Sequence, residues 1–389
     1  MEMNNFDVII VGSGLLGLST AYHAQKAGGR VIVVDRGPVA YEASSRATGY
    51  LSLRADDPDE APLATLAEKH WNTLDEELGY PTEWTPKGRL WVAFSDKQVD
   101  ELREIHKAFQ RADDSFELID ADACRKLIPI LSKEARAGVY TPRSGHANPQ
   151  RVSQAYAWAF QDLGGVILEN TPVYSVIVES GKVKGVRTNS GEIYADRVVL
   201  CAAGYNAKLL EPFGVNFPVA SVRLEALVTT PLPHMYDVGF IGLNGLSIRQ
   251  TKRGNLHANG GPHEWVDVDA DREPAKPNTP IVRNLVRRII EAFPVAAGTQ
   301  LLRTWAGVLD ITRDQKSILH RFENPEGLLA AAGGGHGFGM APAVGIAMAE
   351  LTLQGRTDAP IQRLSLDRFG TLSREWKTEK KWNAGEYNT

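Results

Sequence analysis

Three glycines near the N-terminus have the spacing of a phosphate-binding turn. Gly12, Gly14 and Gly17 form Gly-x-Gly-x-x-Gly directly after an apolar run of β-branched residues. The first allows a tight turn, the second lets a pyrophosphate approach the backbone, and the third lets a helix pack closely on the strand. The first amides of that helix attract phosphate oxygens. Asp35 follows a second apolar run, where its carboxylate can accept hydrogen bonds from ribose hydroxyls and would repel a 2′-phosphate.

The surrounding pattern indicates the elements that position these residues. Residues 6–11 predict a buried strand, 15–26 a helix rich in Ala and Leu, and 31–34 a second strand. Strand, turn, helix, strand and acid therefore follow one another in the order of the dinucleotide-binding fingerprint. The motif alone does not distinguish NAD from FAD.

A second glycine-rich loop lies far along the chain. Residues 328–332 predict a strand, the stretch from Gly333 to Gly339 contains five glycines, and a helix is expected from Pro342 to about Gln354. A helix cap needs one glycine rather than five, so we favour contact with a second negative centre.

The loop of residues 42–50 contains small hydroxyl residues and a glycine. This composition suits either the wrapping of an anionic group or a solvated turn, and the residues alone do not decide between them.

Further along, residues 173–194 predict a three-stranded antiparallel excursion that returns to a buried strand at 198–200. The other expected helices are 62–79, 96–111, 120–127, 150–163 and 280–293, and the other expected strands are 89–94, 166–169, 221–229, 246–250 and 255–259, with a loop over 264–280 and a tail over 371–389.

Composition excludes several classes of protein. The 389 residues are 43% hydrophobic and 23% charged, with a net charge of −4, which gives no electrostatic case for nucleic acid. We expect no membrane span, no signal peptide and a cytoplasmic location. The two cysteines, Cys124 and Cys201, lack the spacing of a metal site, and we expect no metal.

The ensemble of motifs resembles a known superfamily over residues 6–368. Four features carry the resemblance: the fingerprint with Asp35, the stretch 43–46, the stretch 198–204, and the stretch 305–342. The chain is similar to the FAD-dependent amine oxidoreductases of the D-amino-acid oxidase, glycine oxidase and sarcosine oxidase superfamily. It looks most like the β subunits of heteromeric sarcosine oxidase, dye-linked proline dehydrogenase and opine oxidase.

The resemblance implies an α/β fold with two domains that are discontinuous in sequence. A Rossmann-like FAD-binding domain is expected from residues 1–80, 145–215 and 301–370. An antiparallel-sheet substrate domain is expected from residues 81–144 and 216–300.

The resemblance also implies the cofactor and its contacts. FAD is expected without a covalent bond, because Trp305 stands where monomeric sarcosine oxidase has its attaching cysteine. An additional FMN at a subunit interface is compatible with the heteromeric relatives. The implied FAD contacts are Gly12, Gly14, Leu15, Leu16, Gly17, Asp35, Arg36, Ser44, Ser45, Arg46, Val173, Ala203, Gly204, Gly335, His336, Gly337 and Phe338.

The implied reaction is hydride transfer from the α C–H of an amine to flavin N5, followed by hydrolysis of the imine. Sarcosine-, proline-, opine- and D-amino-acid-like substrates all fit. The usual carboxylate-binding cations of the superfamily are absent near Leu309 and at Gly339, so Arg54 is the first candidate for that role and Arg249 the second. A surface or structural role is equally compatible with either arginine.

The electron acceptor is predicted from one strand. His257 or a neighbour is expected where oxidases place a lysine over the flavin, which predicts a dehydrogenase with a dye, a quinone chain or a partner subunit as acceptor. The alternatives are a stand-alone oxidase of the glycine or D-amino-acid type and a flavoprotein subunit that only relays electrons. An NAD-dependent dehydrogenase is disfavoured by the distant glycine-rich loop.

Overall fold

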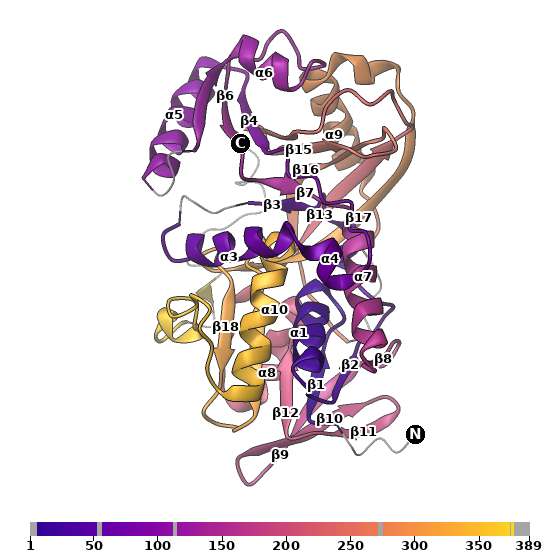
Figure 1. Ribbon diagram of the computed structural model, residues 1–389, viewed down its shortest axis with the longest axis vertical. Coiled ribbons are helices and arrows are strands. Elements are labelled where there is room, and N and C mark those ends of the chain that lie inside the picture. The colour runs from indigo at the N-terminus through magenta and orange to yellow at the C-terminus, as the bar shows by residue number, and fades with distance from the viewer. Residues whose placement is uncertain (1–5, 53–56, 112–114, 271–274, 374, 377–389) are drawn as a thin grey trace.

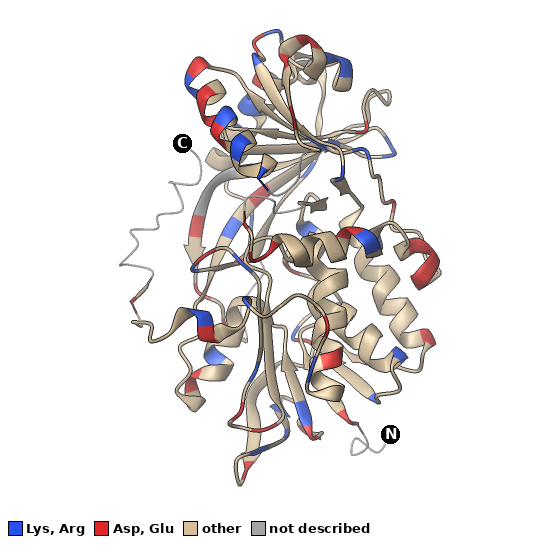
Figure 2. Ribbon diagram, turned by 60° about the vertical axis from the view of Figure 1, so that its left-hand side comes forward, with Lys and Arg blue, Asp and Glu red and all other residues tan. Residues whose placement is uncertain are grey.

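The computed structural model describes residues 6–52, 57–111, 115–270, 275–373 and 375–376. Two units are stacked along the long axis of the molecule (Figure 1), with β3 (Tyr50–Leu51) and β7 (Gly145–His146) between them. Acidic and basic residues are interspersed over both units (Figure 2). None of the helices in the described ranges has the length and apolar character needed to cross a bilayer.

The lower unit has three layers around a six-stranded sheet. The sheet is parallel except for β18, and its strand order is β18-β19-β12-β1-β2-β8. One apolar face packs against helices, and the other packs against a three-stranded antiparallel sheet. The strands of the large sheet are β1 (Val8–Val11), β2 (Val31–Val34), β8 (Val166–Leu168), β12 (Arg197–Leu200), β18 (Ile318–Arg321) and β19 (Leu328–Ala332); those of the small sheet are β9 (Val173–Glu179), β10 (Lys182–Thr188) and β11 (Gly191–Tyr194); the longer helices are α1 (Leu15–Lys26), α3 (Ala61–Trp71), α7 (Pro149–Asp162) and α10 (Gly337–Gln354), and the short ones are α2 (Ala43–Arg46), α4 (Leu74–Leu78) and α8 (Asn206–Leu210).

The upper unit is built on an eight-stranded sheet with the order β17-β13-β16-β15-β14-β4-β6-β5. The apolar face of α9 closes its core, which contains Phe240, Leu285 and Phe293. The remaining bounds are β4 (Arg89–Ala93), β5 (Glu117–Asp120), β6 (Ala137–Thr141), β13 (Val219–Thr229), β14 (Gly239–Gly242), β15 (Leu246–Gln250), β16 (Leu256–Val266), β17 (Leu301–Thr312), α5 (Asp96–Gln110), α6 (Ala121–Leu127), α9 (Thr279–Ala292) and the 3-10 turns η1 (Ala203–Tyr205), η2 (Glu211–Phe213), η3 (Pro294–Gly298) and η4 (Leu366–Phe369).

The first strand, turn and helix are confirmed where the glycine spacing predicted them. Gly12 has φ of +108°, and a Cβ on it would lie 2.5 Å from the carbonyl oxygen of Cys201. A Cβ on Gly17 would lie 2.0 Å from the carbonyl oxygen of Gly12. The turn therefore admits no side chain at either position, and α1 runs from Leu15 to Lys26 as expected.

Several expected elements differ from those observed. Residues 62–79 form two helices, because the chain turns tightly at Thr73, whose N–H donates to the carbonyl of His70. The buried residues of both helices belong to one hydrophobic core, so the apolar pattern in the sequence is continuous across the turn. α10 begins at Gly337, so Pro342 lies inside the helix. β14 was not predicted, because its Gly-Phe-Ile-Gly sequence is too short to show alternation.

Two boundaries also differ. β17 pairs with β13 from Leu301 to Thr312, so these residues belong to the upper sheet although residues 301–370 were expected to continue the lower unit. The expected loop over 264–280 starts later, because β16 continues to Val266. Within the expected tail, the Trp376 side chain is buried.

We expect the contact between α1 and α10 to tolerate no added carbon. A Cβ on Gly345 would lie 2.0 Å from Ser19 Oγ and 2.7 Å from the Ser19 carbonyl carbon. Gly345→Ala should therefore lower the free energy of unfolding by about 1–3 kcal/mol, measured by urea denaturation. Gly298→Ala is the matched control, because no atom lies within 4 Å of its Cβ position. Equal midpoints for the two variants would contradict this packing.

Candidate functional site

A cavity of about 540 Å³ lies between the two units. Its floor comes from the ends of the lower strands and its roof from the underside of the upper sheet. Two of the predicted cofactor contacts, Gly17 and Ser45, are not among the residues that line this cavity. Gly17 packs against the backbone of Gly12, and the Ser45 carbonyl accepts a hydrogen bond from Gln150 Nε2 at 2.5 Å. The predicted contacts that line the cavity are Gly12, Gly14, Leu15, Leu16, Asp35, Arg36, Ser44, Arg46, Val173, Ala203, Gly204, Gly335, His336, Gly337 and Phe338.

The start of α1 and the loop of residues 42–50 form one wall. The Leu15 N–H donates to Ser44 Oγ at 2.8 Å, which places the loop against the helix terminus. A Cβ on Gly14 would meet only Ser44 Oγ, at 3.3 Å. Of the two interpretations of this loop, the structure therefore supports the wrapping of the cavity rather than a solvated turn.

Asp35 fixes the fingerprint loop from the end of β2. Its Oδ2 accepts hydrogen bonds from the Ser13 N–H at 2.5 Å and from Ser13 Oγ at 2.8 Å. Its Oδ1 accepts the Gly37 N–H at 2.9 Å. The carboxylate thus holds the glycine turn in place at the end of the cavity where the fingerprint puts a ribose.

Asp310 holds the second glycine-rich loop from the upper sheet. Its Oδ2 accepts the Gly333 N–H at 2.6 Å. Burial raises the pKa of Asp310, and the amides of Gly333 and Gly334 oppose that shift. The loop also packs directly on the backbone of Lys316, because a Cβ on Gly334 would lie 2.6 Å from the Lys316 carbonyl group. The first amides of α10 are thereby fixed at the cavity wall.

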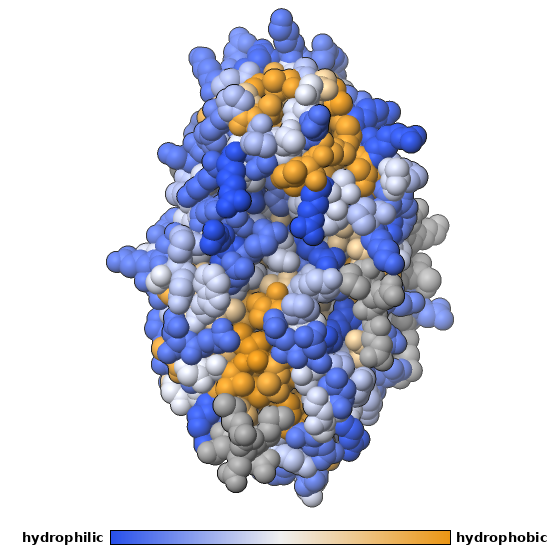
Figure 3. All heavy atoms as spheres, turned by 90° about the vertical axis from the view of Figure 1, so that its right-hand side faces the viewer, coloured by the Kyte–Doolittle hydropathy of each residue, from blue (hydrophilic) through white to orange (hydrophobic). Residues whose placement is uncertain are grey.

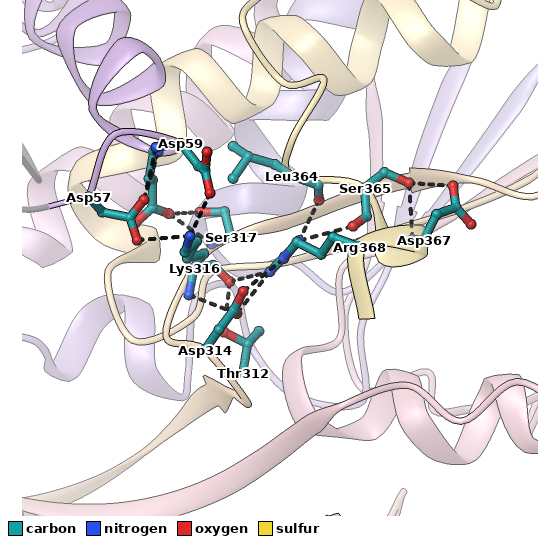
Figure 4. Close-up of polar contacts among 11 residues, drawn as sticks. Asp57, Asp59, Thr312, Asp314, Lys316, Ser317, Leu364, Ser365, Asp367 and Arg368 are labelled. Atoms are coloured by element: carbon teal, nitrogen blue, oxygen red, sulfur yellow. Dashed lines mark hydrogen bonds and ion pairs between the residues drawn. The ribbon is translucent and has the colours of Figure 1, made fainter. Parts of the chain in front are cut away.

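Lys316 belongs to a network of charged groups that supports this loop (Figure 4). Its Nζ lies 3.1 Å from Asp57 and 2.7 Å from Asp59. Burial acts to lower the pKa of Lys316, but the hydrogen bonds that its ammonium donates to these two aspartates outweigh it and raise the pKa. Arg368, in η4, pairs at 2.9 Å with Asp314, which lies in the turn before Lys316. The network joins the glycine-rich loop to the residues that precede α3.

The segment of residues 46–50 connects the two units by hydrogen bonds to backbone carbonyls. Arg46 Nη1 donates to the Ala306 carbonyl at 2.6 Å, and Trp305 Nε1 donates to the Arg46 carbonyl at 3.1 Å. Arg249 Nε donates to the Thr48 carbonyl at 2.5 Å, and the Tyr50 hydroxyl donates to the Ile248 carbonyl. These contacts hold the roof of the cavity over its floor.

The predicted substrate residues Arg249 and His257 lie just beyond the cavity wall. They face each other on β15 and β16, with Arg249 Nη2 3.3 Å from His257 Nδ1. An arginine can only donate, so Nδ1 accepts and the neutral imidazole carries its proton on Nε2. Burial, Arg249 and His146 hold the pKa of His257 well below its usual value. Arg54, the first candidate for carboxylate binding, lies outside the described residues.

The cavity wall also contains polar residues that the sequence did not single out. Tyr50, Arg89, Ser247 and Asn259 line the cavity. Arg89 stacks on the Tyr50 ring with its Cζ 4.9 Å from the ring centroid. Their only sequence signal is the alternation along the strands, which shows which residues share a face but not that this face covers a cavity.

The comparisons with known proteins agree with this geometry. A family model described as FAD dependent oxidoreductase matches residues 7–351. The β subunit of sarcosine oxidase from Rhodobacter capsulatus is 28% identical over 360 residues, which are 90% of this chain and 85% of that protein. Glycine oxidase from Geobacillus kaustophilus has a TM-score of 0.88 at 22% identity, covering 95% of this chain and 99% of that one.

L-Proline dehydrogenase from P. horikoshii has a TM-score of 0.84 at 23% identity, covering 97% of this chain and 99% of that one. At such identities the two structural matches show the fold, which is a Rossmann-like FAD domain with a substrate domain. The family model spans most of the chain, and the predicted cofactor contacts other than Gly17 and Ser45 line one cavity. The chain therefore belongs to the family of FAD-dependent oxidoreductases.

Proposed function

We propose that this protein oxidises a secondary amine or an amino acid and acts as the catalytic β subunit of a heteromeric dehydrogenase. The observation that carries the proposal is the continuity of one cavity from the fingerprint, past the glycine-rich loop, to the polar roof of the upper sheet. Sarcosine oxidase β subunits, glycine oxidases and an L-proline dehydrogenase among the similar proteins support an amine as the substrate.

The residues of this chain fit FAD. The N-terminus of α1 suits the pyrophosphate, because Gly14 leaves room there that only Ser44 Oγ approaches. Asp35 marks the adenosine ribose, and the start of α10 directs amide groups toward the place where negative charge gathers on reduction. FAD supplies the hydride acceptor, while the chain binds and orients the amine and excludes water. An indole has no nucleophile that could attach a flavin, and Trp305 instead donates its N–H to the Arg46 carbonyl. Its place in the attachment segment therefore supports a cofactor held without a covalent bond.

The substrate end of the cavity suits a polar amine that carries a carboxylate. Arg89, Ser247 and Asn259 offer donors from the roof, and Tyr50 offers an aromatic face. We retain Arg54 as the carboxylate-binding residue. Arg249 is the weaker candidate, because its guanidinium already donates to Thr48 and His257.

A partner subunit is supported by the surface of the upper unit. Figure 3 shows apolar side chains gathered there on one face. β17 is an edge strand of the eight-stranded sheet, and Leu302 near its start is 63% exposed, with Ile290, Val295 and Leu301 also exposed. Exposed apolar edges favour association. A chain that is monomeric and fully active with dyes on its own would contradict the subunit role. FMN at such an interface remains part of this proposal.

The proposed function is tested by anaerobic bleaching. The purified flavoprotein is mixed with N-alkyl amino acids, proline, opines and D-amino acids, and the flavin absorbance is followed. At least one class should bleach the flavin, and acid precipitation should leave the yellow colour in the supernatant. If no member of the panel bleaches the flavin, the protein is better described by the alternative of an electron-relay subunit.

We expect Gly14→Ala to separate folding from cofactor binding. The added methyl group meets only the Ser44 side chain in the protein, at 3.3 Å, but it occupies the space that the pyrophosphate needs. The variant should express as a soluble protein with near-normal unfolding of the apoprotein and should lose most of its FAD, measured by absorbance after gel filtration. Gly298→Ala serves again as the control. Full FAD content in Gly14→Ala would show that the pyrophosphate binds elsewhere.

We expect Arg54→Ala to raise KM strongly for substrates that carry a carboxylate. A bidentate pair with the carboxylate is lost, and hydrogen bonds to charged groups contribute about 1.5–3 kcal/mol. FAD content should not change. Arg249→Met should instead weaken the contact of the two units at Thr48 and lower thermal stability. If Arg54→Ala leaves KM unaltered while Arg89→Ala raises it, the carboxylate is bound by the roof.

We expect slow reaction with oxygen and fast reaction with an artificial acceptor. His257 is neutral because its pKa lies well below the usual value, so it gives little electrostatic help to a developing superoxide. The group becomes cationic only when the pH falls below that lowered pKa, so the oxygen rate should not rise between about pH 8 and pH 6. Substrate turnover is measured under air with and without a dye. Oxygen consumption as fast as dye reduction would support the alternative of a stand-alone oxidase.

A further inference from the structure

A short segment of the upper unit crosses to the adenosine end of the FAD site. β16 stays paired with β13 up to Val266, which lies opposite Ser221. The next residues, 267–270, leave the sheet, and Val268 and Ala270 line the cavity. Their neighbours in that wall include Arg36, directly after Asp35, and Gly204. Because the acid after the second strand marks the ribose, this segment lies over the adenosine half of FAD.

Asp269 attaches the segment to the lower unit at two points. Its backbone carbonyl accepts a hydrogen bond from Arg36 Nη1, and its carboxylate lies 3.2 Å from Lys208 Nζ. Arg36 is itself oriented by Glu42, whose Oε1 lies 3.2 Å from Arg36 Nη2. The attachments come from two different elements of the lower unit, so the segment bridges the opening between them.

The attachment points are rigid parts of the lower unit. Lys208 is in α8, which begins at the buried Asn206. The Asn206 amide donates to the carbonyls of Leu200 and Ala331 at 3.2 and 2.9 Å, so α8 is bound to β12 and β19. On the other side, the segment continues directly from a paired strand of the upper sheet. The ion pair between Asp269 and Lys208 therefore joins α8 to the segment that continues β16, and it resists separation of the two units at this end.

We propose that residues 267–270 form a strap across the adenosine half of the FAD site and that Asp269, through Lys208 and Arg36, fastens it and slows the release of FAD. Asp269 and Lys208 are positioning residues, because neither lines the cavity. Their side chains are 69% and 47% exposed, so salt screens their attraction. The bond from Arg36 to the backbone carbonyl persists when the Asp269 side chain is removed. FAD retention should therefore be salt-dependent and only partly lost on breaking the ion pair.

The test is the rate at which the holoenzyme releases FAD after dilution, followed by the rise of flavin fluorescence. Lys208→Ala and Asp269→Ala should each release FAD about two- to fivefold faster than the wild type at low ionic strength, the range expected for an exposed ion pair. At 1 M salt the Debye length falls to about 3 Å, so the attraction between Asp269 and Lys208 is screened. Wild type and variants should then release FAD at the same rate. The exchanged pair Lys208→Glu with Asp269→Lys should recover slow release.

The matched control is Lys182→Ala. Lys182 begins β10 in the lower unit, and its Nζ forms an exposed ion pair with Glu326 at 2.9 Å. This substitution should leave the release rate unchanged. The absorbance spectrum of bound flavin should be the same in all variants, because the strap lies at the adenosine end. Release from Lys208→Ala and Asp269→Ala at the wild-type rate in low salt, or acceleration by Lys182→Ala to the same degree, would overturn the proposal. Amine oxidation is not measured, so this outcome is independent of the proposed substrate.

Discussion

The site depends on the hydrogen bonds that join residues 46–50 to the underside of the upper sheet. Side chains from both units donate to backbone carbonyls of the other, with Arg46 to Ala306 and Trp305 back to Arg46 as a reciprocal pair. Charged donors strengthen such bonds, and burial of Arg249 makes its bond to Thr48 costly to break. This connection helps to hold the cavity together, because its floor and its roof come from separate sheets.

Close backbone contacts complete the floor. Gly12 and Gly17 let β1, α1 and the end of β12 approach more closely than any side chain permits, and Gly334 does the same for the second loop on Lys316. Both loops are then held by carboxylates, Asp35 for the first and Asp310 for the second. The amide groups at two helix termini are therefore fixed before a ligand arrives, so little reorganisation is needed to meet negative charge.

Electrostatics differ between the two ends of the cavity. At the fingerprint end, Glu42 lies 3.2 Å from Arg36 and 4.0 Å from Arg46, while Asp35 accepts hydrogen bonds from Ser13 and Gly37. Outside the cavity wall at the other end, burial keeps His257 and His146 neutral, with the pKa of His146 lowered to about 3. These two histidines therefore carry no positive charge at neutral pH, in keeping with chemistry supplied by the flavin.

Local sequence determined the parts of this protein that depend on neighbours in the chain. The glycine spacing with Asp35 predicted the first strand, turn and helix. The resemblance carried by four short stretches predicted the family, and most of the cofactor contacts that it implied line the cavity. These signals are strong because steric exclusion at Gly12 and Gly17 permits few alternatives. Tertiary structure alone decided that β17 completes the upper sheet, that Arg249 binds the Thr48 carbonyl rather than standing free, and that residues 267–270 reach Arg36 and Lys208. Each of these results from pairing between segments far apart in the chain, and no local periodicity records which strands meet or which carbonyl a buried guanidinium finds.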